Sequence, residues 1–255
     1  MPHPNAIEPE LERQLQALAQ ATELSILLDY DGTLVPIVET PDLAVPDEPL
    51  LALLSSLAAR PRTAVHVVSG RPRSDLQRWF GELPVFLWAE HGIFCRLRDG
   101  VWEPTRSVNG DWMDEIAPLL ERVTAKTPGS LLERKEASLA WHYRLADPAL
   151  AAHRAHDLRV RLRLALNGQA VEILEGKKVI EVRPRGIGKA VVARHIDRAE
   201  GDLPAILALG DDRTDDDLFV ALPSSAVTVA VGRGTKARYR VADFRAARAL
   251  LRVLL

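Results

Sequence analysis

Residues 24–37, "LSILLDYDGTLVPI", form an apolar run that ends in two closely spaced aspartates. The run predicts a buried strand. Because side chains alternate faces along a strand, Asp29 and Asp31 are expected side by side on one face. Carboxylates that close repel each other, so the pair needs a cation or a shared proton. A calcium loop counted from Asp29 would need Gly and Glu where Leu34 and Thr40 stand, which excludes that interpretation.

Predicted strands and helices alternate around this segment. A helix that could begin with an Asn5–Glu8 capping box precedes it. The alternation is typical of α/β proteins with a Rossmann-like, mostly parallel sheet covered by helices. Further strands are predicted at 63–69, 85–90, 204–212 and 226–232, and helices at 49–60, 73–81, 188–200, 215–222 and the C-terminus.

The alternation of single strands and helices is interrupted between residues 105 and 183. Helices are predicted at 111–126 and 148–166, and each is followed by two strands joined by a tight turn. Strands joined in this way pair antiparallel, so the block has the order αββαββ. We therefore expect a core of residues 1–104 and 184–255, interrupted by an inserted lid, or cap, domain at 105–183.

Composition limits the partners and the compartment. The net charge is −2 and acids and bases are interspersed, so neither nucleic acid nor anionic lipid is expected to bind. No apolar stretch approaches the ~18 residues of a membrane span. The lone Cys95 excludes an internal disulfide, and the early segment "EPELERQLQALAQ" is charged. We expect a cytoplasmic monomer that acts on a small molecule.

Four segments carry polar or charged side chains that could bind a ligand or react, and each lies just beyond a predicted strand or at the start of a helix. In open α/β sheets ligands bind outside the carboxyl ends of the strands, so the fold would gather the three segments that follow strands at one edge. Aspartates there suit Mg²⁺, while a serine, backbone N–H groups and a lysine suit an anion. The combination indicates phosphoryl transfer, without a P-loop. The segments are Asp29 with Asp31, Ser69-Gly70-Arg71, Lys189, and Asp211-Asp212.

Some of these residues have simpler interpretations. Taken alone, Ser69 is better explained as the N-cap of the following helix. Asp215 to Asp217 fit acids favoured by the dipole of a helix N-terminus. Glu133 and Lys135 could be an ordinary cross-strand charge pattern.

The charges suggest a mechanism. A carboxylate attacking a phosphate dianion at ~4 Å meets a repulsion of about 4 kcal/mol per charge pair at an effective dielectric near 20. Mg²⁺ and Lys189 would cancel it. The leaving alkoxide needs a proton, which an ordinary aspartate supplies poorly at neutral pH. Our hypothesis is that Asp29 is the nucleophile and Asp31 is first the acid and then the base that activates water.

"DYDGTL", "VVSGR", Lys189 and "GDDRTDDDLF" resemble, in order, the four motifs of the haloacid-dehalogenase-like phosphatases. "AEHG", "ERKEASLAWHYR" and "GKKVIEVRPRGIGK" resemble, more narrowly, the trehalose-6-phosphate phosphatase family. This similarity runs from about residue 24 over nearly the whole chain. It implies a haloacid-dehalogenase-like core, a cap that recognises the sugar, and Mg²⁺-dependent hydrolysis of trehalose 6-phosphate, in trehalose biosynthesis, through an aspartyl-phosphate.

The resemblance also implies residue roles. Asp216 departs from the glutamate that is usual in the family, and Ala190 from its glycine. Asp29 and Asp31 match the catalytic residues; Asp29, the carbonyl of Asp31, and Asp211 match the Mg²⁺ ligands; Ser69, Gly70 and Lys189 match the phosphate-binding residues; Glu133, Lys135, Lys177 and Glu181 match the sugar-binding residues; Asp212 and Asp215 match supporting acids.

Three alternatives stay open. The same chemistry could act on another sugar phosphate, such as sucrose 6-phosphate or a glycosyl-phosphoglycerate. The scaffold could serve as a non-catalytic sugar-phosphate sensor, although such sensors commonly lose a catalytic aspartate and both are present here. A phosphotransferase would pass the phosphoryl group to an acceptor other than water.

Overall fold

The computed structural model describes residues 8–97, 100–107, 109–197, 204–232 and 236–255. The chain forms two compact units. The core unit comprises Met1–Thr105 and Gly188–Leu255, and the cap unit comprises Arg106–Ile187. These boundaries lie one and four residues beyond those expected from the sequence.

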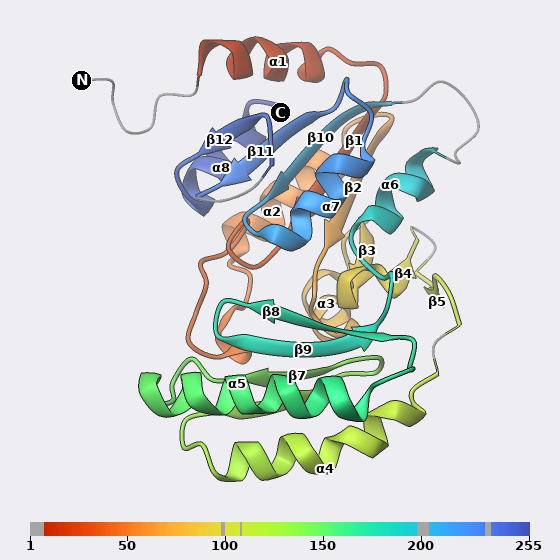
Figure 1. Cartoon of the computed structure of the whole chain (residues 1–255). Helices are drawn as coiled ribbons and strands as arrows, with labels where there is room; N and C mark the ends of the chain where they lie inside the picture. Colours follow the sequence, from red (N-terminus) through yellow and green to blue (C-terminus); the bar gives the residue numbers. More distant parts are fainter. Residues whose placement is uncertain (1–7, 98–99, 108, 198–203, 233–235) are drawn as a thin grey trace. The chain divides into compact units, whose positions relative to one another are not determined.

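The core unit is built on an eight-stranded sheet with the order β12-β11-β10-β1-β2-β3-β4-β5 (Figure 1). Neighbours from β12 to β3 are parallel, and β4 and β5 continue the sheet antiparallel. The predicted α/β class is therefore confirmed. The strands are β1 (Leu24–Asp29), β2 (Thr63–Val68), β3 (Phe86–Ala89), β4 (Phe94–Arg96), β5 (Trp102–Pro104), β10 (Ala205–Gly210), β11 (Val227–Val231) and β12 (Tyr239–Val241).

Both faces of this sheet are buried. Alternate residues of β1 belong to different apolar clusters: Ile26 and Leu28 pack with α2 and α8, and Leu27 packs with α6 and α7. A strand covered on both faces needs a continuous apolar run, which is what "LSILL" provides. The helices of the unit are α1 (Pro9–Ala19), α2 (Glu48–Ala58), α3 (Arg73–Phe80), α6 (Ala190–Asp197), α7 (Arg213–Ala221) and α8 (Phe244–Arg252), with short 3₁₀ turns η1 (Pro41–Leu43) and η2 (Glu90–Gly92).

The first helix starts differently from the expected capping box. Glu8 is the N-cap of α1, and its side chain makes no capping hydrogen bond. Asn5 lies outside the described residues. Leu11, Leu15 and Leu18 form the buried stripe of α1, as their helical spacing predicts.

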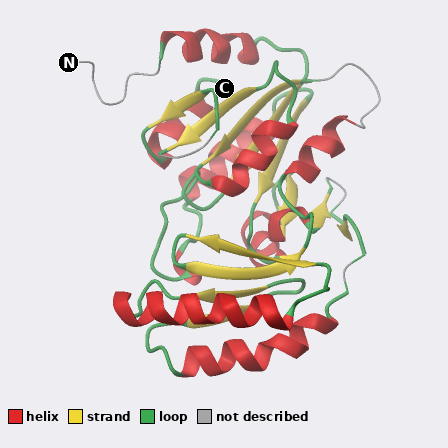
Figure 2. Ribbon diagram, in the orientation of Figure 1, coloured by secondary structure: helices red, strands yellow, loops and turns green. Residues whose placement is uncertain are grey.

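The cap unit pairs one antiparallel sheet with two helices (Figure 2). Leu139, Trp141 and Val182 lie in the apolar cluster shared with the helices, so the alternate residues of these strands belong to the other face. The sheet has the order β6-β7-β9-β8, and the elements are α4 (Asp111–Ala125), β6 (Leu131–Arg134), β7 (Leu139–His142), α5 (Pro148–Ala165), β8 (Val171–Gly176) and β9 (Val179–Pro184).

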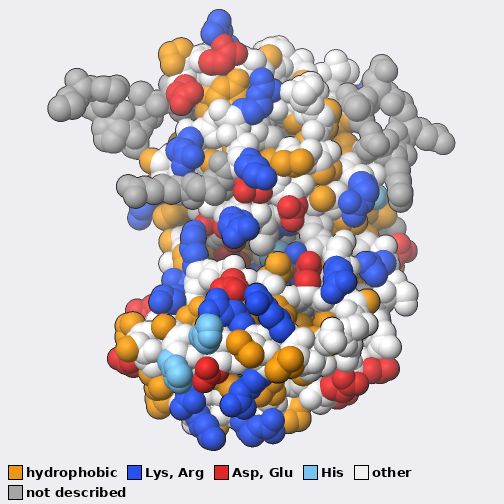
Figure 3. Space-filling view, in the orientation of Figure 1, with side chains coloured by type: hydrophobic (Ala, Val, Ile, Leu, Met, Phe, Trp, Pro, Cys, Tyr) orange, Lys and Arg blue, Asp and Glu red, His pale blue; other side chains and the backbone are white. Residues whose placement is uncertain are grey.

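Figure 3 shows Lys and Arg side chains scattered over this face of the molecule among acidic and hydrophobic ones. None of the described helices is both long and apolar enough to span a bilayer.

Candidate active site

The turn that follows β1 brings two segments together. Asp29 is the last residue of β1, and Gly32 has the positive φ of 87° that glycine tolerates best. A Cβ at Gly32 would stand 2.4 Å from Oδ2 of Asp211, the residue directly after β10. Glycine is therefore needed for the Asp211 carboxylate to lie against this turn.

The loop at residues 31–47 is fastened to the core by side chains from other elements. The Tyr30 hydroxyl, which is fully buried, donates to the Ala44 carbonyl at 2.6 Å. From α8, Arg248 Nε donates to the Leu34 carbonyl at 2.7 Å, and Nη1 donates to both oxygens of Asp47 at 2.8 and 2.7 Å. The loop after the two aspartates is thus held at both of its ends.

Lys189 joins two buried carboxylates. It lies directly before α6 and is 2% exposed. Its Nζ donates to Asp29 Oδ1 at 2.5 Å and to Asp215 Oδ1 at 2.6 Å. The other oxygen of Asp215 accepts from the backbone N–H groups of Asp211 and Asp212, at 3.0 and 3.1 Å. Segments from three places in the sequence therefore meet in one hydrogen-bonded cluster.

The same cluster offers a site for a cation. Carboxylate oxygens of Asp29, Asp211 and Asp215 lie within 4.8 Å of one another. Asp215 already uses both of its oxygens. Asp29 Oδ2, in contrast, is buried and has no hydrogen-bond partner among the described residues. A buried carboxylate oxygen without a partner is costly, and a hard divalent cation would satisfy it. The residues present therefore fit Mg²⁺.

Burial controls the protonation of these acids. It raises the pKa of Asp29 to about 8, although the ammonium of Lys189 opposes the shift. It also raises the pKa of Asp215 to about 6, again against Lys189. Burial works to lower the pKa of Lys189, but the carboxylates of Asp215 and Asp29 outweigh it and leave that pKa above its usual value. Without a metal, Asp29 therefore keeps its proton near neutral pH.

Asp212 and Asp216 lie near this cluster in sequence, but their carboxylates accept hydrogen bonds from other residues. Asp212 caps α7, because its Oδ1 accepts from both the backbone N–H and the hydroxyl of Thr214 at 2.7 Å. Burial works to raise the pKa of Asp212, but Lys189 and the Thr214 hydrogen bonds outweigh it and lower that pKa. Asp216 accepts from the Lys236 backbone N–H at 2.5 Å.

The carboxylate of Asp31 is directed to Arg71. The guanidinium Nε and Nη2 donate to the two oxygens of Asp31 at 2.8 and 2.5 Å, a fork that fixes the orientation of the acid. Nη1 of Arg71 donates to the Pro41 carbonyl. Asp31 does not belong to the cation cluster formed by the described acids, so the two aspartates after β1 face different partners.

Ser69 lies at the end of β2 and is 1% exposed. Its hydroxyl accepts from the Arg71 backbone N–H at 3.1 Å. The N-cap of α3 is Pro72, so the interpretation of Ser69 as the cap of that helix is wrong. A Cβ on Gly70 would stand 2.6 Å from His91 Nε2, which shows how closely the His91 ring packs on this turn.

In the cap unit, three of the four predicted sugar-binding residues form one network on the sheet face opposite the helices. Lys135 Nζ donates to Glu181 Oε1 at 3.0 Å and lies 4.0 Å from Glu133 Oε2. Lys177 lies in the turn between β8 and β9, where its carbonyl accepts from Arg144 Nη2 at 2.9 Å.

Three residues of these sites received no role from the sequence. Arg71 directly follows the predicted Ser69-Gly70 pair, and this adjacency was the available signal. Ser138 donates its hydroxyl to Glu181 Oε1 at 3.0 Å, and His142 Nε2 lies 2.9 Å from Glu133 Oε2. Both contacts depend on how the strands are aligned with one another, and the sequence alone does not determine that register.

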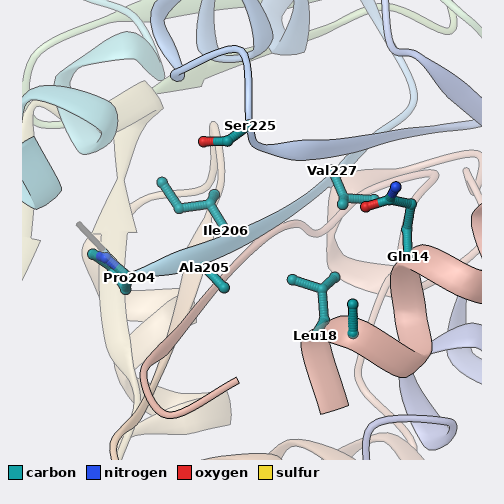
Figure 4. Close-up of a pocket in the computed structure, with 8 residues that line it drawn as sticks. Gln14, Leu18, Pro204, Ala205, Ile206, Ser225 and Val227 are labelled. Atoms are coloured by element: carbon teal, nitrogen blue, oxygen red, sulfur yellow. The ribbon is translucent and has the colours of Figure 1, made fainter. Parts of the chain in front are cut away.

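A separate cavity of about 390 Å³ lies between α1 and the first residues of β10 and β11 (Figure 4). Leu18, Ala205 and Val227 are among its lining residues. It opens at the amino ends of these strands, whereas the acids follow their carboxyl ends. The cavity is therefore not part of the acidic site.

Comparison with known proteins places this arrangement in a family. A family model described as trehalose-phosphatase matches residues 27–245. A bifunctional trehalose-6-phosphate synthase/phosphatase of Thermoproteus tenax is 45% identical over 249 residues, which make up 97% of this chain and 34% of that protein. The chain spans about a third or less of the length of the curated relatives it matches.

Solved structures agree with the family and with the fold. The C-terminal domain of C. albicans trehalose-6-phosphate phosphatase superposes with a TM-score of 0.87 at 32% identity, over 96% of this chain and 95% of that one. A haloacid dehalogenase-like hydrolase of Bacteroides thetaiotaomicron shares the fold, with a TM-score of 0.62 at 16% identity, over 91% of this chain and 99% of that one. The chain belongs to the trehalose-phosphatase family.

Proposed function

We propose that this chain is a Mg²⁺-dependent phosphatase that hydrolyses trehalose 6-phosphate to trehalose and phosphate. The observation that carries the proposal is the buried Asp29, whose Oδ1 is held by Lys189 while Oδ2 has no partner among the described residues. Family membership supports trehalose 6-phosphate as the substrate.

In the first step Asp29 attacks the phosphorus atom. A bond forms between its carboxylate and phosphorus, and the bond from phosphorus to the sugar oxygen breaks. Asp31 gives the leaving oxygen a proton. Arg71 occupies both oxygens of Asp31 in this structure, so a protonated Asp31 must give up one of those two hydrogen bonds in the reacting complex.

In the second step Asp31 takes a proton from a water molecule. The resulting hydroxide attacks phosphorus, the bond to Asp29 breaks, and phosphate leaves. Asp29 and Asp31 return to their starting states, so atoms and protons balance. Lys189 offsets the negative charge that the phosphoryl group brings to the Asp29 carboxylate.

Asp29, Asp211 and the Asp31 carbonyl would hold Mg²⁺. The ion would supply positive charge at the phosphoryl oxygens and favour the ionised form of Asp29, whose pKa burial raises. Ser69 and Gly70 are proposed to bind the phosphoryl oxygens together with Lys189. A cytoplasmic location and a monomeric state stay predictions of the sequence.

Phosphate release from a panel of esters tests the proposal. The panel contains trehalose 6-phosphate, sucrose 6-phosphate, a glycosyl-phosphoglycerate and para-nitrophenyl phosphate, each with Mg²⁺ and with EDTA. We expect trehalose 6-phosphate to have the highest kcat/KM and EDTA to abolish turnover of all four. A tenfold preference for another sugar would defeat the trehalose assignment, and full activity in EDTA would defeat the metal assignment. Turnover that depends on an added acceptor would indicate a phosphotransferase.

A further inference from the structure

Partners of both cap acids lie in β7 or directly before it. On the sheet face opposite the helices, Ser138, Ala140 and His142 follow one another at alternate positions of the chain. Ala140 pairs with Glu133 on one side and with Glu181 on the other. The two acids are thus two strand spacings apart, about 10 Å, with a small side chain between them.

The small Ala140 leaves space for Lys135 to reach across β7. Lys135 starts beyond β6, yet its Nζ contacts Glu181 on β9 at 3.0 Å. Ser138 donates to the same oxygen of Glu181, also at 3.0 Å. Glu181 is therefore held by two donors independently of His142.

Glu133 depends on His142. The carboxylate accepts from His142, so Nε2 carries the hydrogen, and the distance to Glu133 Oε2 is 2.9 Å. Lys135 approaches that same oxygen only to 4.0 Å. Burial works to raise the pKa of Glu133, but the His142 hydrogen bond and the charge of Lys135 outweigh it and keep that pKa below its usual value. Glu133 is therefore an ionised acceptor at neutral pH.

The two oxygens of Glu133 differ. Both protein contacts fall on Oε2, and within the described part of the chain Oε1 accepts no hydrogen bond. A carboxylate held through one oxygen presents the other in a fixed direction. A hydroxyl that donates to Oε1 would gain a charge-assisted hydrogen bond without further ordering of the side chain.

We propose that His142 is a positioning residue for sugar recognition: it holds Glu133 Oε2 so that Oε1 accepts a hydrogen bond from a hydroxyl of the sugar part of the substrate. The proposal rests on the sugar-phosphatase function proposed above. It assigns His142 to specificity and gives it no part in phosphoryl transfer.

The test compares two esters in the wild type and in variants at His142, Glu133 and His153. Trehalose 6-phosphate carries sugar hydroxyls, and para-nitrophenyl phosphate carries none. For His142→Ala we expect kcat/KM for trehalose 6-phosphate to fall about 10- to 100-fold, mainly through KM, because a hydrogen bond to a charged group is lost. Activity on para-nitrophenyl phosphate should change less than about twofold. His142→Gln, whose amide nitrogen can reach the position of Nε2, should recover most of the loss.

Two further variants serve as controls. His153→Ala removes an exposed histidine of the same unit and should leave both activities unchanged. In a Glu133→Gln background, His142→Ala should cost little more, since both residues act through one contact. Thermal unfolding checks that each variant is folded. If His142→Ala is not folded, the comparison uses His142→Gln, which keeps the contact with Glu133, and His142→Asn, whose side chain is too short to make it.

The outcomes separate this inference from the proposed function. Equal losses on both esters would show a structural role and overturn the positioning role, as would an unchanged kcat/KM or a fully additive double variant. If the wild type itself shows no preference for sugar phosphates, the proposed function fails instead.

Discussion

The core and cap units both carry a lysine between two acids, but they hold it in opposite ways. In the core, Lys189 bonds to Asp29 and Asp215, and all three side chains are at most 7% exposed. These groups come from distant segments, since Asp29 and Lys189 are 160 positions apart in the sequence. In the cap, Lys135 lies between Glu133 of β6 and Glu181 of β9, two strands with β7 between them, and the Glu133 side chain is 22% exposed.

The difference follows from the tasks proposed for the two units. Buried charges interact strongly and shift pKa values, which suits bond making at phosphorus. A half-exposed network leaves a carboxylate oxygen accessible, which suits recognition of hydroxyls. Parallel strands bring remote segments to one edge, whereas hairpins place neighbours in sequence on one face.

The strongest test of this contrast is Asp29→Asn. We expect kcat on every ester to fall by about 10⁴-fold or more, because the attacking carboxylate is lost in a step that nothing in the cap can replace. Single-turnover phosphate release on trehalose 6-phosphate and para-nitrophenyl phosphate measures it. Near-normal turnover by the folded variant would contradict the assignment of Asp29 as the nucleophile.

A matched pair of lysine variants sharpens the comparison. Lys189→Ala leaves two buried carboxylates without their cation, so we expect the free energy of unfolding to fall by about 3 kcal/mol and kcat to fall on both esters. Lys135→Ala removes a less buried partner and should cost about 1 kcal/mol, with loss of activity on the sugar phosphate alone. Urea unfolding and kinetics on both esters provide the readouts. Equal effects of the two substitutions would remove the distinction between the units.

A pH dependence of stability between pH 4 and 8 is expected to come from the core. The folded pKa of Asp29 is raised to about 8 from 3.8, so its contribution to stability is complete below about pH 4 and is lost as pH rises through 8. Asp215, raised to about 6, acts in the same direction. In EDTA the unfolding free energy should therefore decrease between pH 4 and 8, and Asp29→Asn should weaken this decrease. Urea midpoints across this range measure it; an identical slope in wild type and variant would refute it.

The sequence identified the framework of both sites. Apolar runs located the central strands, and the rule that ligands bind beyond strand carboxyl ends brought Asp29, Ser69 and Asp211 to one edge. Three strands of only three residues, β4, β5 and β12, were not predicted, because so short a segment shows no measurable period.

Side-chain partners were harder to predict. The fork between Arg71 and Asp31 joins residues 40 apart, and the contact between Ser138 and Glu181 joins residues 43 apart. Such contacts depend on register and rotamer, which single-sequence patterns do not encode. Asp215 was expected at a helix N-terminus and does lie there, but its spacing from Asp212 also fits the capping box that turns its side chain inward.

The hydrogen bonds of Arg248 tie the last helix, α8, to the loop that follows the two aspartates of the first strand. Arg248 and Leu34 are 214 residues apart in sequence, yet their hydrogen bond joins α8 to the loop after Asp31. Residues 31–47 and Phe244–Arg252 must therefore match each other: in a chimera of two related proteins that took the first segment from one parent and the second from the other, the arginine of α8 would face a loop that did not evolve with it.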